Sequence, residues 1–182
     1  MEMNNIRKIT EEDFLLKLQK KGIHMEDIPT LLVEKLISHN LKIATTESCT
    51  GGLISKLITD QSGASAVFDC GVCSYANCIK EKVLGVSADT LEAFGAVSPN
   101  TAKEMAEGVL SLAGADIGVS TTGIAGPSGG SKEKPVGLVY IAVAKKSETE
   151  IIMADFSAKN NNRDKNRQLA AHLALYCAFI SI

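Results

Sequence analysis

The stretch Ala44-Thr45-Thr46-Glu47-Ser48-Cys49-Thr50-Gly51-Gly52 joins an apolar run to an amphipathic one. The apolar residues from Leu41 to Ala44 are typical of a short buried strand, and those from Leu53 to Ile58 recur at helical spacing. Ser48 therefore lies at a predicted strand-to-helix junction. Backbone N–H groups at such a junction have no partner within the helix, so they can hold a phosphate or an oxyanion. Glycine at 51 and 52 leaves room for a substrate.

The same stretch also has an ordinary structural interpretation. Serine, threonine and glycine are common capping residues at a helix start, and the Gly-x-Ser-x-Gly pattern of a nucleophile elbow is absent. Taken alone, the segment fits a helix cap as well as a nucleophile.

Two further polar segments follow strand-like runs. Gly71 to Lys80 leads from an apolar stretch into a helical one, and Thr121 to Ser131 is a glycine-rich segment between two predicted strands. In an open α/β sheet, ligands bind where loops leave the carboxyl ends of the strands. We therefore expect the three segments to meet in one crevice.

The chain alternates between strand and helix patterns. Helices are predicted from Thr10 to Lys21 and from Pro29 to His39, then near 50–60, from 77, at 89–94, 98–112 and 162–180, with strands near 41–46, 66–75, 116–121, 136–145 and 150–156. The pattern predicts the α/β class: a three-layer α/β/α sandwich with a mostly parallel mixed sheet of about five strands. The last two strands are predicted to form an antiparallel hairpin. We expect residues 1–28 to be an N-terminal helical appendage and residues 29–182 to be the main domain.

Composition limits the partners. The chain has 182 residues, a net charge of −2, 4% aromatic residues and no Trp, which argues against a nucleic-acid surface. The apolar tract from Leu169 to Ile182 is shorter than the roughly 20 residues that cross a bilayer, so it is predicted to be a buried C-terminal helix rather than a membrane anchor. Met1 to Gly22 has no hydrophobic block typical of a signal peptide, and we expect a cytoplasmic protein.

Cysteine chemistry is a rival explanation for the first stretch. The five cysteines are an odd number without an export signal, so they are expected to be reduced. Cys70-x-x-Cys73 lies in a predicted strand, where residues three apart face opposite sides, so no metal site is predicted. A thiolate of Cys49 at a helix start could attack an amide, but His24, His39 and His172 lie too far along the chain to indicate a partner.

Several motifs together resemble the CinA C-terminal domain family over about residues 30 to 180. They are Thr46-Glu47-Ser48-Cys49-Thr50-Gly51-Gly52, Ser74-Tyr75-Ala76-Asn77-x-x-Lys80, Gly95-Ala96-Val97-Ser98, Thr122-Gly123-Ile124-Ala125-Gly126-Pro127-x-Gly129-Gly130, and Glu133-Lys134-Pro135-Val136-Gly137. The combination is far more specific than any single motif. The resemblance implies the same α/β/α fold and an activity that converts nicotinamide mononucleotide to nicotinic acid mononucleotide and ammonia, without a cofactor or metal. It also implies a stand-alone form of the family, a small-molecule nucleotide substrate and a homo-oligomer.

The resemblance places the family's catalytic serine and lysine on Ser48 and Lys80. The predicted substrate-binding positions are Thr50, Gly51, Gly52, Tyr75, Asn77, Thr122, Gly123, Gly126, Gly129, Gly130 and Arg163. Backbone N–H groups near Thr50 to Gly52 are expected to hold the oxyanion. A lysine acts as a base only when neutral, so the site must lower its pKa from about 10.4 to near neutrality by burial. When the resemblance is set aside, the charged neighbours Glu81 and Lys82 favour a solvated helix face for Lys80.

The glycine-rich segment lacks the Walker and dinucleotide-binding patterns, although its backbone N–H groups can cradle one phosphate. Lys132, Lys134, Arg163 and Arg167 are the candidate charge partners for that phosphate. Arg163 matches a family arginine, but Asn161-Asn162 stands where the family has Gly-Asp. Two other functions fit: a non-catalytic nucleotide-binding or interaction module, and an amidase for another small amide.

Overall fold

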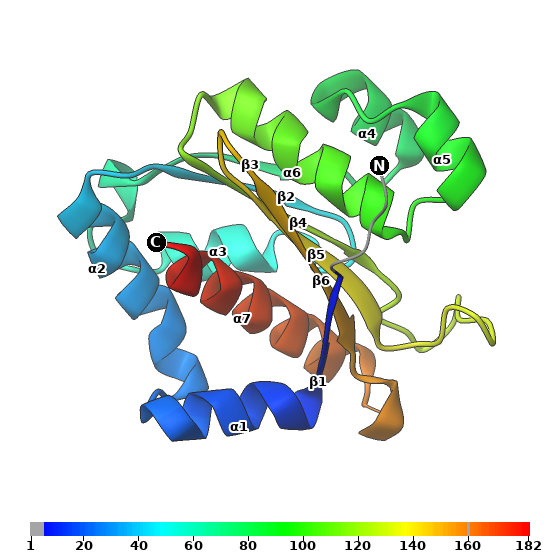
Figure 1. Cartoon of the computed structure of the whole chain (residues 1–182), viewed down its shortest axis with the longest axis horizontal. Coiled ribbons are helices and arrows are strands. Elements are labelled where there is room, and N and C mark those ends of the chain that lie inside the picture. The colour runs from blue at the N-terminus through cyan, green and yellow to red at the C-terminus, as the bar shows by residue number, and fades with distance from the viewer. Residues whose placement is uncertain (1–5, 160) are drawn as a thin grey trace.

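The computed structural model describes residues 6–159 and 161–182, so residues 1–5 of the predicted N-terminal segment lie outside the described residues. The described residues form a six-stranded mixed sheet with helices on both faces (Figure 1). The expected α/β/α architecture is confirmed.

The sheet has the strand order β1-β6-β5-β4-β2-β3. Its strands are β1 (Arg7–Thr10), β2 (Ile43–Glu47), β3 (Phe68–Cys73), β4 (Ile117–Gly123), β5 (Leu138–Ala144) and β6 (Thr149–Asp155). The pairings β1–β6, β2–β3 and β2–β4 are parallel, whereas β5 runs antiparallel to both β4 and β6. The predicted hairpin is therefore the β5–β6 pair.

Helices α4, α5 and α6 cover one face of the sheet, and α1, α2, α3 and α7 cover the other (Figure 1). Their bounds are α1 (Glu11–Lys21), α2 (Ile28–His39), α3 (Leu53–Thr59), α4 (Asn77–Leu84), α5 (Ala88–Phe94), α6 (Pro99–Ala113) and α7 (Arg163–Ser181), with short 3-10 helices at Met25–Asp27, Ala64–Ala66 and Ser157–Lys159. Helix α7 packs against the central strands β4 and β5, and all its residues from Leu169 to Ala178 are buried. The predicted buried C-terminal helix is confirmed.

The N-terminal segment contains a strand that the sequence pattern did not predict. Thr10 caps α1 as expected, with Asp13 completing a capping box. Just before this cap, β1 pairs with β6 in parallel, and Ile9 is its one buried residue. Four residues are too few to show a strand periodicity, because the pairing depends on a partner strand more than 140 residues away.

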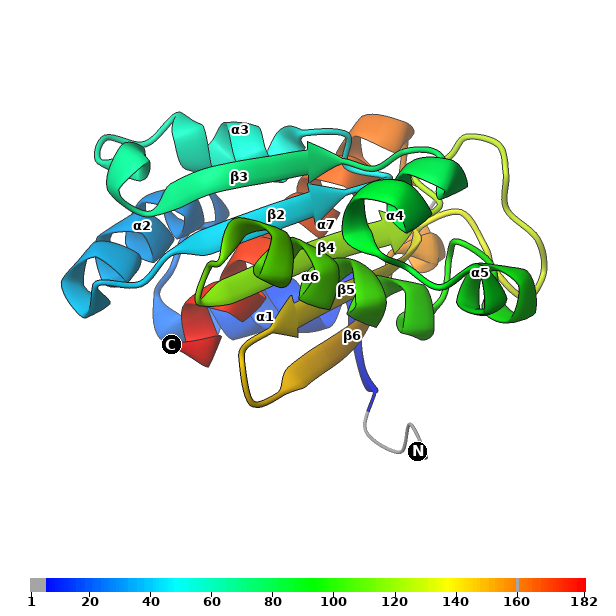
Figure 2. The same ribbon diagram turned by 90° about the horizontal axis from the view of Figure 1, so that it is seen from above.

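The carboxyl ends of β3, β2 and β4 lie at one edge of the sheet. These strands are neighbours and parallel, so the chain leaves all three at the same end (Figure 2). The segments that follow are the Ser48 turn, the Ser74 to Asn77 segment and the glycine-rich loop from 124 to 137. The expected convergence of the three polar segments is confirmed.

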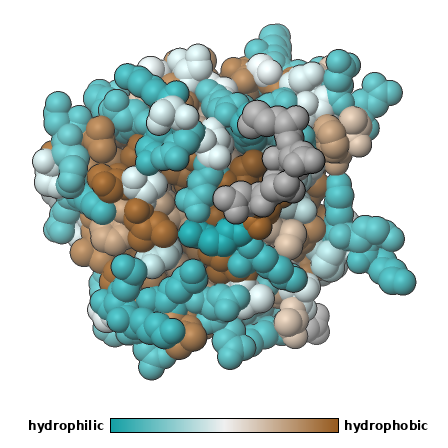
Figure 3. Space-filling view, in the orientation of Figure 1, coloured by the Kyte–Doolittle hydropathy of each residue, from teal (hydrophilic) through white to brown (hydrophobic). Residues whose placement is uncertain are grey.

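On the face shown in Figure 3, hydrophilic residues cover most of the periphery and hydrophobic residues lie between them near the centre. Among the described residues, no helix combines the length and the apolar character needed to span a bilayer.

Candidate active site

The turn after β2 is held in place by a buried carboxylate. Glu47, the last residue of β2, is fully buried, and its two oxygens accept hydrogen bonds from the N–H groups of Gly52 (3.0 Å), Ile54 (3.0 Å) and Ser55 (2.8 Å) and from the Ser55 hydroxyl (2.8 Å). Gly52, the N-cap of α3, offers no side chain for this purpose and has φ +92°, a conformation that favours glycine. Glu47 therefore caps α3 from the preceding strand, where its charge also complements the helix dipole.

Removing this carboxylate should destabilise the protein. Glu47→Gln turns an NH2 group toward two of the four donors, and each hydrogen bond to a charged group is worth about 1.5–3 kcal/mol, so we expect a loss of about 2–4 kcal/mol in the free energy of unfolding. Urea denaturation at neutral pH measures this loss. The matched control is Glu34→Gln on exposed α2 surface, which should stay within about 0.5 kcal/mol of wild type. Equal stability of the two variants would contradict the capping role.

Three backbone N–H groups of the turn have no acceptor. Ser48 donates its N–H to the Thr121 carbonyl (2.9 Å), and Glu47 accepts the N–H of Gly52. In the part of the chain that the structure describes, the N–H groups of Cys49, Thr50 and Gly51 make no hydrogen bond. Thr50 is fully buried and the N–H of Gly52 already has an acceptor, so the candidate oxyanion donors are the N–H groups of Cys49 and Gly51 rather than those of the expected Thr50 to Gly52.

Lys80 reaches the turn from α4 through the protein interior. Its side chain is fully buried, which rules out the solvated-face interpretation. Nζ donates to the carbonyls of Ser74 (2.6 Å) and Tyr75 (3.3 Å) and lies 3.4 Å from Ser48 Oγ. Within the described residues no carboxylate forms an ion pair with it. Burial lowers the pKa of the Lys80 ammonium, and the nearby Cys49 opposes this shift only in part.

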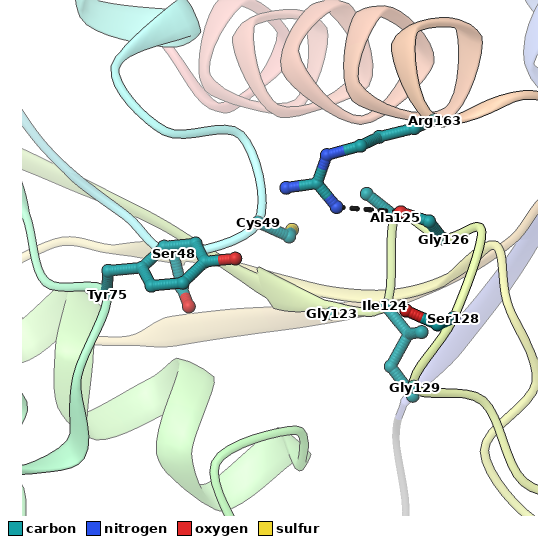
Figure 4. A pocket seen from close by; sticks show the side chains of 10 residues that line it. All are labelled: Ser48, Cys49, Tyr75, Gly123, Ile124, Ala125, Gly126, Ser128, Gly129 and Arg163. Carbon is teal, nitrogen blue, oxygen red and sulfur yellow. Dashed lines mark hydrogen bonds between the residues drawn. The ribbon is translucent and has the colours of Figure 1, made fainter.

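A cavity of about 190 Å³ opens beside Ser48 (Figure 4). Six of the predicted site residues line it: Ser48, Tyr75, Gly123, Gly126, Gly129 and Arg163. Cys49, Ile124, Ala125 and Ser128 also line it and were not among the predicted binding residues. All four are direct neighbours of predicted residues. Cys49 was considered only as a rival nucleophile, and nothing in the chemistry of the other three indicated the role.

The other predicted positions do not line this cavity. Thr50 is buried and shares a hydrogen bond with the Thr121 hydroxyl (2.7 Å), and buried Thr122 donates to the Ala96 carbonyl (2.6 Å). Asn77 is exposed at the start of α4. The remaining predicted positions outside the cavity lining are Gly51, Gly52 and Gly130.

Cys49 lies in the cavity wall next to Ser48 but is poorly suited to act as the nucleophile. Its side chain is only 6% exposed, and burial raises the pKa of its thiol to about 12. The thiolate that would attack an amide is therefore disfavoured near neutral pH.

Two arginines from the first turns of α7 approach the site. Arg163 donates to the Gly126 carbonyl (2.8 Å), as Figure 4 shows, and Arg167 donates to the Thr50 carbonyl through Nη2 (2.6 Å) and Nε (3.2 Å). Neither forms an ion pair within the described residues. Lys134 instead donates to the Phe94 carbonyl (2.9 Å), and neither it nor exposed Lys132 lines the cavity. In the described ranges, no group of three or more His, Cys, Asp or Glu is placed to hold a metal ion.

Comparisons with known proteins identify similar chains. The family described as the CinA C-terminal domain matches residues 25–180. A putative competence-damage inducible protein of Caldanaerobacter subterraneus subsp. tengcongensis is 55% identical over 142 residues, which cover 78% of this chain and 34% of that protein. The chain thus spans about a third of the length of the curated relatives it matches.

Solved structures match over nearly their whole length. The competence/damage inducible protein CihA from Agrobacterium tumefaciens is 39% identical, with a TM-score of 0.79 and coverage of 84% of this chain and 92% of that one. A CinA superfamily protein from Klebsiella pneumoniae is 31% identical, with a TM-score of 0.82 and coverage of 87% and 97%. The resemblance read from the motifs is confirmed.

Proposed function

The chain belongs to the CinA C-terminal domain family, and from this premise we propose that it hydrolyses the carboxamide of nicotinamide mononucleotide, with Ser48 as nucleophile and Lys80 as general base. The products are nicotinic acid mononucleotide and ammonia. The sequence motifs suggest the substrate, and the surroundings of Lys80 support the mechanism.

One observation carries the proposal: Lys80 Nζ is fully buried within reach of Ser48 Oγ and has no carboxylate partner among the described residues. A neutral lysine has two N–H donors and one lone pair. The carbonyls of Ser74 and Tyr75 accept the two N–H groups, and Ser48 Oγ, 3.4 Å away, is the partner left for the lone pair. Full burial without a counter-charge favours this neutral form. The amine is then poised to accept the Ser48 proton.

The reaction follows from these positions. Ser48 Oγ bonds to the carboxamide carbon while its proton passes to Lys80 Nζ, and the carbonyl oxygen becomes an oxyanion near the N–H groups of Cys49 and Gly51. Collapse of this intermediate breaks the C–N bond, and Lys80 returns the proton to the departing nitrogen, which leaves as ammonia. Water then attacks the acyl-enzyme with Lys80 again as base, which releases the carboxylate and restores Ser48.

The cavity suits one end of such a substrate. At about 190 Å³ it is smaller than the roughly 300–1,000 Å³ of typical ligand pockets, so the carboxamide ring would fill it and the phosphate would lie at the rim. Arg163 stands at that rim, together with the backbone of Gly126 and Gly129. An exposed guanidinium without a carboxylate partner is suited to bind phosphate.

The direct test measures ammonia released by the purified protein from nicotinamide mononucleotide, nicotinamide and glutamine. We expect turnover of the mononucleotide alone. Turnover of glutamine or free nicotinamide in preference would identify an amidase for another substrate. Tight binding of the mononucleotide without ammonia would indicate a non-catalytic binding module.

A second prediction concerns the phosphate. Two or three charge-assisted contacts at about 1.5–3 kcal/mol each should give the mononucleotide roughly a hundredfold or higher kcat/KM than nicotinamide riboside. Arg163→Ala should shrink this preference by roughly tenfold or more while leaving kcat/KM for the riboside unchanged. Equal losses on both substrates would show that Arg163 supports the fold rather than the phosphate.

A further inference from the structure

Arg167 holds the nucleophile turn through a different backbone atom from those that Glu47 contacts. It lies on α7, one turn after Arg163. Its Nη2 (2.6 Å) and Nε (3.2 Å) both donate hydrogen bonds to one backbone atom, the Thr50 carbonyl oxygen. Thr50 is fully buried, and its hydroxyl is bonded to Thr121. The turn is therefore tied to α7, to β4 and, through Glu47, to the start of α3.

The direction of one carbonyl fixes the direction of the next N–H. In a trans peptide the Thr50 C=O and the Gly51 N–H point in opposite directions. Because Arg167 draws the carbonyl toward α7, the Gly51 N–H is turned away from α7. Gly51 has φ +60° and no Cβ, so this peptide would rotate easily if nothing held it.

A phosphate-binding role for Arg167 is less consistent with these contacts. The Nε–Nη2 edge of its guanidinium, the pair suited to grip an anion with two donors, is already occupied by the Thr50 carbonyl. Arg167 is also absent from the cavity wall, whereas Arg163 lines it.

We propose that Arg167 is a positioning residue that orients the Thr50–Gly51 peptide, so that the N–H of Gly51 stays turned away from α7 and available to the reacting oxygen. This inference rests on the proposed function only in taking Ser48 as the nucleophile. It does not depend on which amide is the substrate.

The experiment therefore uses a substrate-independent probe beside the substrate assays. A fluorophosphonate reagent phosphonylates an active serine: Ser48 Oγ displaces fluoride from phosphorus, Lys80 takes the serine proton, and the P=O oxygen occupies the oxyanion position. The second-order rate of labelling is measured for wild type, Arg167→Met, Arg167→Lys and the control Lys165→Met, together with kcat and KM for the mononucleotide and the riboside. Lys165 lies on the same helix and contacts Glu11 instead of the turn.

For Arg167→Met we expect labelling and kcat on both substrates to fall by roughly a hundredfold, with little change in KM, because small misplacements of an active site cost this much. Arg167→Lys should recover part of the loss through one donor, and Lys165→Met should match wild type. If Arg167→Met does not fold, the lysine variant carries the same comparison.

Three results would overturn the inference. A loss confined to the phosphorylated substrate, with normal labelling, would make Arg167 a phosphate ligand. Unchanged labelling and turnover in Arg167→Met would show that Arg167 has no role in orienting the turn. If wild type is labelled at Ser48 but does not hydrolyse the mononucleotide, the proposed substrate is wrong while the labelling rates still test Arg167. If wild type is neither labelled at Ser48 nor able to hydrolyse the mononucleotide, Ser48 is not the nucleophile, and the inference about Arg167 is then wrong as well.

Discussion

Ser48→Ala should lower kcat for nicotinamide mononucleotide by about a thousandfold or more, whereas Cys49→Ala should cost less than about tenfold. The first change removes the attacking oxygen. The second removes a buried thiol whose pKa is raised to about 12, so that it supplies almost no thiolate near neutral pH. The two neighbours line the same cavity, and this makes them a matched pair.

Mass spectrometry of the intact protein during turnover identifies the acylated residue directly. An adduct of nicotinic acid mononucleotide on the Ser48 peptide that is lost in Ser48→Ala is the expected result. An adduct on Cys49, or wild-type activity in Ser48→Ala, would reassign the nucleophile. Circular dichroism and thermal melting of both variants exclude a loss caused by unfolding.

The sequence was sufficient for the order of elements because each long element carries its own signal. Alternation of apolar runs with helical periodicity predicted the fold class, and the helix predicted at 98–112 is α6, with Ser98 as its N-cap. The convergence of three loops also followed, since neighbouring parallel strands deliver their carboxyl ends to one edge. Strand β1 was not predicted, because its pairing with β6 is long-range and its own sequence is short.

The site was predicted in part, for a related reason. The resemblance to a family supplied Ser48 and Lys80, but burial decides the chemistry of Lys80, and the charges that flank it in the sequence indicate the opposite environment. Glu47 belongs to one of the family motifs, but no role was predicted for it. The four groups that donate hydrogen bonds to its carboxylate come from the start of the next helix. A signal was available: an acidic residue at the end of a buried strand, before a helix without a capping side chain, has few other partners.

Arg167 shows the limit of reasoning from charge alone. The sequence placed it with Lys132, Lys134 and Arg163 as a candidate for phosphate binding, because all four are cationic residues near polar loops. In the structure, Arg167 donates two hydrogen bonds to the carbonyl of Thr50, which lies 117 residues earlier in the chain. No local sequence pattern encodes this contact. The three loops and α7 therefore form one arrangement, in which the helix links the nucleophile turn to the glycine-rich loop.

Lys80→Arg and Lys80→Met should both lose about a thousandfold or more in kcat, since arginine keeps the charge but cannot release its proton near neutral pH and methionine has no base at all. In wild type, burial lowers the pKa of Lys80, so the neutral amine is present above that pKa and is protonated as the pH falls through it. The rate of wild type should therefore fall on the acidic side as Lys80 takes up a proton, and this limb should be absent from the residual activity of both variants. Lys82→Arg, an exposed change on the same helix, is the control and should retain the wild-type profile. An arginine variant that keeps most of the wild-type rate would show that position 80 supplies only charge. Restored turnover of a Lys80→Ala variant in the presence of a small alkylamine would show that this position supplies a base.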